Sequence, residues 1–313
     1  MATSGSKDFA LTRSSIIEAA LRKIGEYDAG ASITGDDTSD AARTLNAFVK
    51  SLVVRGADLF LREEVTLFLQ KDQQSYSLGS SSADHHTASY VETTLSAAEA
   101  SGQTVISVTS SAGMTAADKV GIKMDDDTIH WSTISSVDSG VQITIANATD
   151  DDAASGNKVY AYTTKADRPQ RIIFPSRRDT SDNDTKVRVI GEDEYRGLSN
   201  KGSSGPVNSI WYHPTLTNGT LYAWPVDGGS SVDKLLYTAL VLPDDFDAAG
   251  NNPEFPIEWG QALIWGLAAE LSFEYGLPRL DRTQIYQKAE LELEHALSYD
   301  VEWASLELGL EGR

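Results

Sequence analysis

The sequence predicts an α+β fold in which helices from both ends of the chain form an antiparallel bundle, with a β-rich middle between them. Two observations predict it. At both ends, apolar residues recur every three to four positions, whereas between residues 64 and 243 they often alternate with polar residues. Each predicted helix has an apolar face to bury, and a four-helix bundle buries all of them. We therefore expect the two ends of the chain to lie close together.

The N-terminal segment, residues 1–63, contains two of these helices. The first covers about residues 12–25 and the second about residues 39–55, and each ends at or just before a glycine. Glycine commonly ends helices because it adopts a left-handed backbone conformation without strain. The apolar residues of each helix recur on one face, and we predict that four of them lie in the bundle core: Ile17, Leu21, Leu45 and Phe48.

The C-terminal segment, residues 244–297, reads as a helical hairpin. Its first helix, about residues 257–275, is apolar nearly all round, so neighbouring helices must cover it on several sides. Gly276 and Pro278 end that helix, and a second amphipathic helix follows from about residue 281. We predict that this hairpin completes the bundle core with Trp259, Leu263, Leu267 and Leu293.

Residues 64–90 and 163–243 are predicted to form a β-rich platform. The segments 64–69 and 75–78 read as a hairpin around Lys71-Asp72-Gln73, and Asn218-Gly219 is a strong two-residue hairpin turn between later strands. Five further strands are expected at residues 171–174, 187–190, 209–213, 220–224 and 235–240.

Residues 91–162 are predicted to form an inserted small all-β domain, either a barrel or a sandwich. Short strands are expected at residues 104–108, 120–124, 128–134, 141–145 and 158–162, with Asp125-Asp126-Asp127 at a hairpin tip. We expect this domain to fold independently.

The chain is strongly acidic, and its charge is uneven. It has 313 residues, with 26 Lys and Arg against 46 Asp and Glu, for a formal charge of −20. From Asp244 to Arg313 there are fifteen acidic and four basic residues. Such a protein does not bind nucleic acid by neutralising phosphates, although it could surround DNA as a like-charged wall. The absence of cysteine excludes disulfides and cysteine-containing zinc sites, and we expect a soluble protein, not a membrane protein.

No motif for catalysis is present, so we predict no enzyme, no cofactor and no metal. The nucleophile elbow, the zinc-protease helix and the phosphate-binding glycine motifs are all missing. His85 and His86 lie in a Ser-rich loop without other histidines at ligand spacing, which favours a solvated loop over a metal site. The runs Asp125–Asp127 and Asp150–Asp152 lack the calcium-loop pattern and read as polar turns.

Two groups of residues on the platform are candidates for contacts. The basic cluster Arg168, Arg171, Arg177 and Arg178 either contacts an acidic partner, such as a neighbouring copy, or is ordinary strand-edge charge. The aromatic residues of two strands are interpreted as core in preference to a ligand platform: Trp211, Tyr212, Tyr222 and Trp224.

The C-terminal tail, residues 298–313, combines large apolar side chains with acidic ones. Its apolar residues are Val301, Trp303, Leu306, Leu308 and Leu310. A terminus this apolar would be a liability if it were left free in solution. It either packs back on its own bundle or docks on another subunit or protein, and we favour docking.

Several segments, in this order and spacing, resemble the head-to-tail adaptor family of short-tailed phages, whose members are also called head-completion, packaged-DNA-stabilisation or tail tubular A-type proteins. They are TRSSIIEAALRKIG (12–25), DAARTLNAFVKSLVVRG (40–56), VTLFLQKDQQSYSLG (65–79), GEDEYRGLSNKGSSGPV (191–207), GTLYAWPV (219–226), LPDDF (242–246) and FPIEWGQALIWGLAAELSFEYG (255–276). Residues 91–162 depart from the minimal family pattern.

This resemblance implies a structural protein of the virion, made in the host cytoplasm and located at the portal vertex. It implies a homo-oligomeric ring, usually of twelve copies, that binds the portal protein and carries the tail nozzle and the tail fibres or spikes. The ring would extend the DNA channel and retain packaged DNA without sequence-specific binding. The tail residues would dock on the portal, and the four arginines would contact neighbouring subunits. The alternatives are a virion-associated glycan-binding protein and a cell-wall hydrolase.

Overall fold

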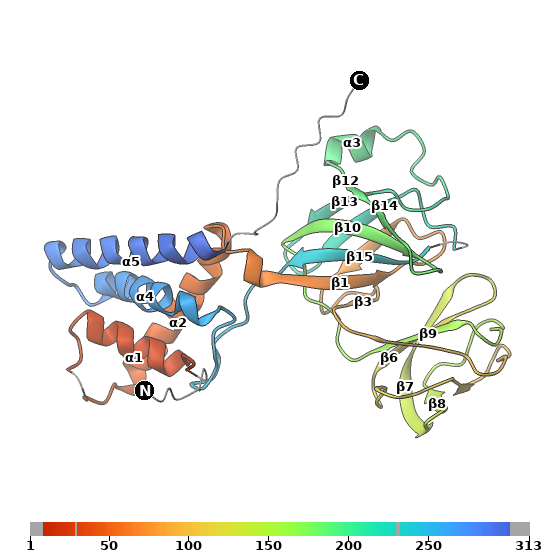
Figure 1. Ribbon diagram of the computed structural model, residues 1–313, viewed down its shortest axis with the longest axis horizontal. Coiled ribbons are helices and arrows are strands. Elements are labelled where there is room, and N and C mark those ends of the chain that lie inside the picture. The colour runs from red at the N-terminus through yellow and green to blue at the C-terminus, as the bar shows by residue number, and fades with distance from the viewer. Residues whose placement is uncertain (1–8, 29, 230–231, 301–313) are drawn as a thin grey trace, which may run out of the picture. The chain divides into compact units, whose positions relative to one another are not determined.

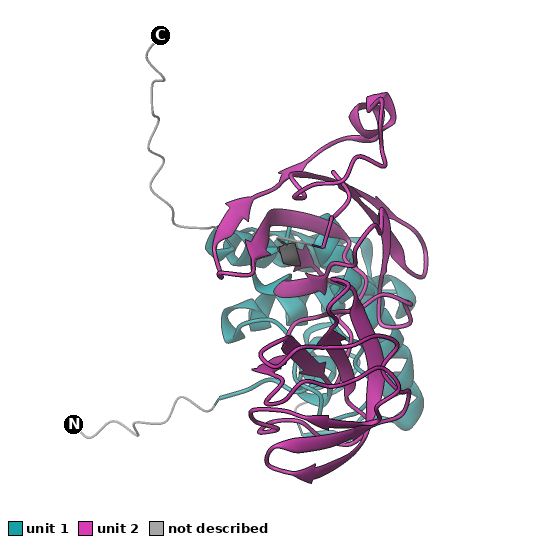
Figure 2. Ribbon diagram, turned by 90° about the vertical axis from the view of Figure 1, so that its right-hand side faces the viewer, with its two compact units in different colours: residues 1–62, 242–313 teal, residues 63–241 magenta. Residues whose placement is uncertain are grey.

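The computed structural model describes residues 9–28, 30–229 and 232–300 (Figure 1). The protein is a mixed α+β structure with about 29% strand and 27% helix, so neither class dominates and the predicted α+β class is confirmed. The chain divides into two compact units (Figure 2). Unit 1 contains residues 1–62 and 242–313, and unit 2 contains residues 63–241.

Unit 1 is built from four long helices, and α4 is the central one. The helices are α1 (Arg13–Lys23), α2 (Gly35–Val54), α4 (Gly260–Glu274) and α5 (Arg279–Tyr299), with the short 3-10 helices η1 (Leu59–Leu61) and η2 (Ile257–Trp259). Helices α1, α2 and α5 each pack against α4, which is why α4 is apolar on nearly every side (Figure 1). The two ends of the chain therefore share one core.

The starts of α1 and α2 are fixed by side-chain caps. Thr12 and Ser15 cap α1 reciprocally, each side chain bonding the backbone N–H of the other residue. Helix α2 begins four residues before the predicted start, because the Thr34 side chain accepts a hydrogen bond from the backbone N–H of Asp37 at 3.2 Å. Asp36 and Asp37 in its first turn also favour this start electrostatically.

The eight residues that the sequence places in the core of the helices are all buried. They are Ile17, Leu21, Leu45, Phe48, Trp259, Leu263, Leu267 and Leu293. Helices α2 and α4 approach closely at Gly266, where an added Cβ would be 2.1 Å from Cζ of Phe48. Gly266 therefore makes room for the Phe48 ring.

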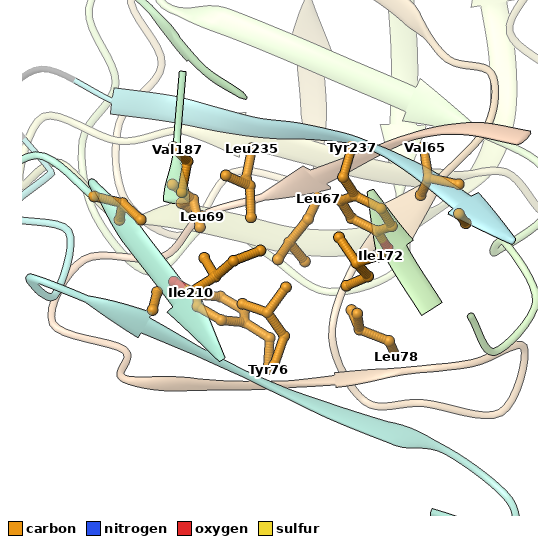
Figure 3. Close-up of a cluster of buried hydrophobic side chains, with 14 of the residues drawn as sticks. Val65, Leu67, Leu69, Tyr76, Leu78, Ile172, Val187, Ile210, Leu235 and Tyr237 are labelled. Carbon is orange, nitrogen blue, oxygen red and sulfur yellow. The ribbon is translucent and has the colours of Figure 1, made fainter. Parts of the chain in front are cut away.

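Unit 2 contains a pair of sheets that face each other. The five-stranded sheet has the order β11-β10-β15-β1-β3 and the four-stranded sheet has the order β12-β13-β14-β2. Their bounds are β1 (Arg62–Phe68), β2 (Ser75–Leu78), β3 (His86–Thr87), β10 (Arg171–Asp179), β11 (Asp184–Lys186), β12 (Arg188–Val189), β13 (Ser209–Pro214), β14 (Gly219–Trp224) and β15 (Val232–Leu240). Apolar side chains from both sheets fill the space between them, among them Leu67, Tyr76, Ile210 and Tyr237 (Figure 3).

The predicted hairpin of residues 64–69 and 75–78 is wrong. Strand β1 pairs with β3 in the five-stranded sheet, whereas β2 pairs with β14 in the four-stranded sheet. Leu67 on β1 and Tyr76 on β2 lie in the same core cluster, so the intervening residues cross from one sheet to the other. Burial alternates along β2, whereas the last four residues of β1 are all buried. Neither pattern identifies the partner strand, and only the tertiary pairing does.

The predicted pairing of residues 209–213 with 220–224 is confirmed, but the turn between them is different. Strands β13 and β14 pair from Ser209↔Trp224 to Pro214↔Gly219, so the connection is the four residues 215–218. Gly219 is the first residue of β14, and a Cβ there would lie 2.0 Å from the hydroxyl oxygen of Tyr212. The glycine admits the Tyr212 ring and does not form the turn.

Residues 91–162 form a separate six-stranded sheet with the order β4-β9-β6-β7-β8-β5. The strands are β4 (Val91–Thr94), β5 (Val105–Ser107), β6 (Lys119–Lys123), β7 (Ile129–Ser139), β8 (Gln142–Ile145) and β9 (Lys158–Tyr162). The two edge strands approach each other at the bridge Leu95↔Val108. As predicted, Asp125–Asp127 lie in the connection between two paired strands, β6 and β7. No helix among the described residues is long and apolar enough to cross a bilayer.

Gly266→Ala is expected to destabilise unit 1 by about 1–3 kcal/mol, because the added methyl group overpacks the contact with Phe48. The Phe48→Leu background should recover part of this loss by removing the ring. Gly35→Ala is the matched control, since no atom lies within 4 Å of a Cβ at that helical glycine. Urea unfolding gives the free energy of unfolding of the wild type and of each variant. Equal losses for Gly266→Ala and Gly35→Ala would contradict the packing argument.

Candidate functional site

The described residues contain no group of three or more His, Cys, Asp or Glu side chains that could hold a metal ion. The candidate binding surfaces are therefore the charged and aromatic clusters of unit 2 and the exposed faces of the helices in unit 1. The tail residues that are predicted to dock on the portal lie outside the described residues. They are Val301, Trp303, Leu306, Leu308 and Leu310.

The four arginines of the platform have different surroundings. Arg178 on β10 forms a bidentate pair with Asp184 on β11, with both N···O distances 2.8 Å, and this hydrogen bonding raises the pKa of Arg178. Arg177 donates to the carbonyl oxygen of Val207 at 3.4 Å, and Arg168 hydrogen-bonds Tyr212. Arg171 is exposed at the start of β10. Their contact with a neighbouring subunit stays a prediction.

The prediction that Trp211 and Tyr222 lie in the core is wrong. Their rings stack on the outer face of the four-stranded sheet, 4.7 Å apart with an interplanar angle of 15°. Tyr195 of the short helix α3 (Glu192–Gly197) covers both rings, with centroid distances of 5.2 and 5.1 Å. Only Tyr212, on the opposite face of β13, packs against the core between the sheets. The outer aromatic pair thus attaches α3 to the sheet.

Trp224 also lies outside the core cluster. It is half-buried, and its indole N–H donates to the carbonyl oxygen of Asn200 at 2.9 Å. This bond, like the Tyr195 stack, attaches the segment around α3 to the four-stranded sheet.

The interpretation of His85 and His86 as a solvated loop is also wrong. His85 stacks on Trp131 with a centroid distance of 3.8 Å, and its Nδ1 lies 2.6 Å from the Tyr162 hydroxyl oxygen. His86 is fully buried on β3, where its Nε2 accepts a hydrogen bond from the backbone N–H of Gly79 at 2.8 Å. Burial lowers the pKa of His85 to about 3 and that of His86 to about 4. Both side chains are therefore neutral structural groups near pH 7.

The histidines contribute to a junction between the inserted sheet and the platform. Phe68 at the end of β1 is buried among rings of the insert, with centroid distances of 5.2 Å to Trp131 and 4.8 Å to Tyr160. Tyr90 packs edge-on against the same ring at 5.2 Å. Aromatic contacts of this kind add to the free energy of burying apolar area, so the junction holds the insert on the platform.

A buried ion pair strengthens the junction. Lys234 of β15 is 2% exposed, and its Nζ lies 2.7 Å from Oε2 of Glu92 on β4. Lys158 on β9 binds the other oxygen of the same carboxylate. Burial alone would raise the pKa of Glu92, but the hydrogen bonds from both lysines outweigh burial and lower it. Glu92 is thus the counter-ion that makes a buried lysine tolerable.

Unit 1 carries an open groove beside the turn between α4 and α5. Its volume is about 640 Å³, and it is lined by Phe273, Arg279, Arg282, Thr283, Tyr286 and Gln287. Phe273 is 61% exposed and Tyr286 is 50% exposed. The Arg282 guanidinium lies over the Phe273 ring, 5.0 Å from its centroid. The groove therefore combines aromatic surface with positive charge.

Helix α5 also exposes apolar residues outside the groove. Its buried row is Ile285, Ala289, Leu293 and Ala296, of which the sequence predicts Leu293 in the core. Leu280 and Leu291, in contrast, are 69% and 44% exposed. These two residues are eleven positions apart, or about three helical turns, so they lie on one side of the helix, opposite the buried row. The sequence reading overlooked this second row.

Neither the protein-family models nor the curated proteins contain a match to this chain.

His86→Gln is expected to reduce the loss of stability on acidification. The unfolded chain binds the His86 proton below its ordinary pKa of 6.5, whereas the folded chain binds it only near pH 4. The part of the free energy of unfolding that depends on a neutral His86 is therefore fully present above pH 6.5. It is lost as the pH falls, by about 2 kcal/mol between pH 7 and pH 5. Glutamine keeps an acceptor for the Gly79 N–H without titrating. Chemical unfolding at both pH values measures the difference, and the exposed His213→Gln variant should behave like wild type.

Glu92→Gln is expected to destabilise unit 2 by about 3 kcal/mol, because it leaves the Lys234 ammonium buried without its counter-ion. Lys158→Met removes the more exposed partner of the same carboxylate and should cost less than about 1 kcal/mol. Denaturant unfolding at pH 7 compares the two variants. Similar losses would show that burial of Lys234 does not depend on Glu92.

Proposed function

We propose that this protein is the subunit of a head-to-tail adaptor ring in a short-tailed phage. In this proposal, about twelve copies form a ring between the portal protein and the tail, which extends the DNA channel and retains the packaged DNA. The protein is a structural part of the virion at the portal vertex, not an enzyme. The observation that carries the proposal is the exposed apolar row of α5.

That row has the properties of a self-association surface. Leu280 and Leu291 present large apolar side chains to solvent on a helix whose opposite side already packs on α4. The exposed parts of these leucine side chains are buried only when another surface covers them. In a ring, the adjacent copy supplies that cover.

The finer architecture is part of the same proposal. Helices α1, α2, α4 and α5 form an antiparallel bundle that stands as one rigid post of the ring wall. Residues 91–162 form a small closed barrel that projects outward from the ring, a reading supported by the bridge Leu95↔Val108 between the edge strands. Residues 64–90 and 163–243 form the platform towards the tail nozzle and the fibres or spikes.

The charge of the chain suits a channel through which DNA slides. The formal charge is −20, and α5 exposes the carboxylates of Asp281 and Glu294. Carboxylates repel phosphates, so a wall bearing them encloses DNA without binding it sequence-specifically. In the proposal, the tail residues 301–313 dock on the portal, and Arg168, Arg171, Arg177 and Arg178 face acidic surface of the adjacent copy.

The combined variant Leu280→Glu and Leu291→Glu is expected to remain folded but to form no closed rings. Electron micrographs of the protein, alone and mixed with the portal protein of the same virus, should show rings for wild type only. Leu216→Glu is the matched control, because this leucine is 96% exposed in a loop of unit 2 and should tolerate the charge. Normal rings from the double variant would refute the proposed contact, and no rings from wild type in either sample would refute the adaptor function.

A further inference from the structure

The groove between Phe273 and Tyr286 carries two arginines that form no ion pair with a described carboxylate, although this part of the chain is rich in acidic residues. Residues 244–313 contain fifteen acidic and only four basic residues. Two of those four bases, Arg279 and Arg282, line this groove. Lys288, a third, is paired with Glu292. Among the described residues, no carboxylate forms an ion pair with Arg279 or Arg282.

The side chains of the groove therefore define the chemistry of an occupant. Two guanidinium groups favour carboxylates, which they bind with charge-assisted hydrogen bonds. The exposed rings of Phe273 and Tyr286 favour large apolar side chains. The groove fits an acidic peptide that also carries leucine or an aromatic residue.

Residues 301–313 of this chain have that composition. Leu306, Leu308 and Leu310 alternate with polar or small residues, and Glu307 and Glu311 lie among them. In an extended peptide, alternate side chains point to opposite sides. The leucines can therefore face the rings together, while Glu307 and Glu311 bring negative charge to the groove and pair with the arginines only if the long Arg279 and Arg282 side chains extend around the peptide.

The chain length allows this segment to reach the groove of its own subunit. Helix α5 rises ~21 Å between Tyr286 and Asp300, at ~1.5 Å per residue. An extended chain covers that distance in about six or seven residues, at ~3.3 Å each. The segment beginning at Glu307 is thus the part that arrives at the groove.

We propose that residues 306–311 seat in the Phe273–Tyr286 groove of their own subunit. The leucines cover the two rings, and Glu307 and Glu311 pair with Arg279 and Arg282. The seat is a contact within one chain, so it forms without a second copy and weakens at high salt, which screens the ion pairs.

A consequence for assembly follows if the adaptor function proposed above is correct. The same apolar residues that dock on the portal are covered while the tail is seated. Portal binding must then displace the tail from the groove, so the free subunit does not expose its docking segment. This consequence rests on the proposed function, whereas the seat itself does not.

Disulfide trapping in the full-length chain tests the seat, because the protein has no native cysteine. One variant carries Gln287→Cys in the groove and Gly309→Cys in the tail. The matched control carries Lys288→Cys and Gly309→Cys, since Lys288 is adjacent in sequence but does not line the groove. A disulfide requires the two Cα atoms to come within about 7 Å.

The Gln287→Cys pair is expected to oxidise at least tenfold faster than the control pair and to give a monomeric product. Adding Arg279→Glu and Arg282→Glu should reduce its rate to that of the control. Equal rates for the two pairs would overturn the seat, as would an unchanged rate after charge reversal. Cross-linked dimers as the main product would also overturn it, because they place the tail in the groove of another copy. None of these results depends on ring formation, which the leucine variants test separately.

Discussion

The organisation of unit 1 depends on the burial of α4 on nearly all of its sides. A helix with that surface is stable in water only when other elements surround it. Helices α1 and α2, from one end of the chain, and α5, from the other, meet this requirement together. The absence of a side chain at Gly266 lets the Phe48 ring lie against the α4 backbone. Because dense packing of this kind tolerates few changes in volume, the N-terminal and C-terminal helices form one well-packed core.

Unit 2 is held together by a different kind of contact. Its inserted sheet, residues 91–162, has an apolar core of its own. Yet Phe68 of the platform is buried among rings of the insert, and Lys234 finds its counter-ion on β4. Independent folding of the insert stays a prediction, but its removal would expose the Phe68 ring and leave Lys234 without its counter-ion. The insert is therefore coupled to the platform, not merely tethered to it by its two connections.

The sequence located the four long helices and most of the longer strands, but it missed α3, β3, β4 and β11, and it identified strand partners less well. Three-to-four residue spacing located all four long helices, because that period reports directly which face is buried. The same kind of pattern could not show that β1 and β2 belong to different sheets, since it reports which residues are buried and not which strand pairs with which. Asn218-Gly219 was misread as a turn because a glycine that admits a neighbouring ring looks the same in sequence as one that turns the chain. His85 and His86 were misread because serine-rich composition suggested exposure, while their burial depends on the distant Trp131 and Gly79.

Helix α5 combines three surfaces that its sequence alone does not separate. One row packs on α4, the Leu280–Leu291 row faces solvent, and Tyr286 lies in the groove. At about 100° per residue, Tyr286 is about 120° around the helix from Leu280. Gln287, however, also lines the groove, and it is seven positions after Leu280 and four before Leu291, so it lies on the leucine side. A neighbouring copy on the leucine row and a peptide in the groove would therefore share part of the helix surface. If both proposals are correct, the seated tail and the adjacent copy compete for the surface around Gln287, so that release of the tail and the contact between subunits are coupled.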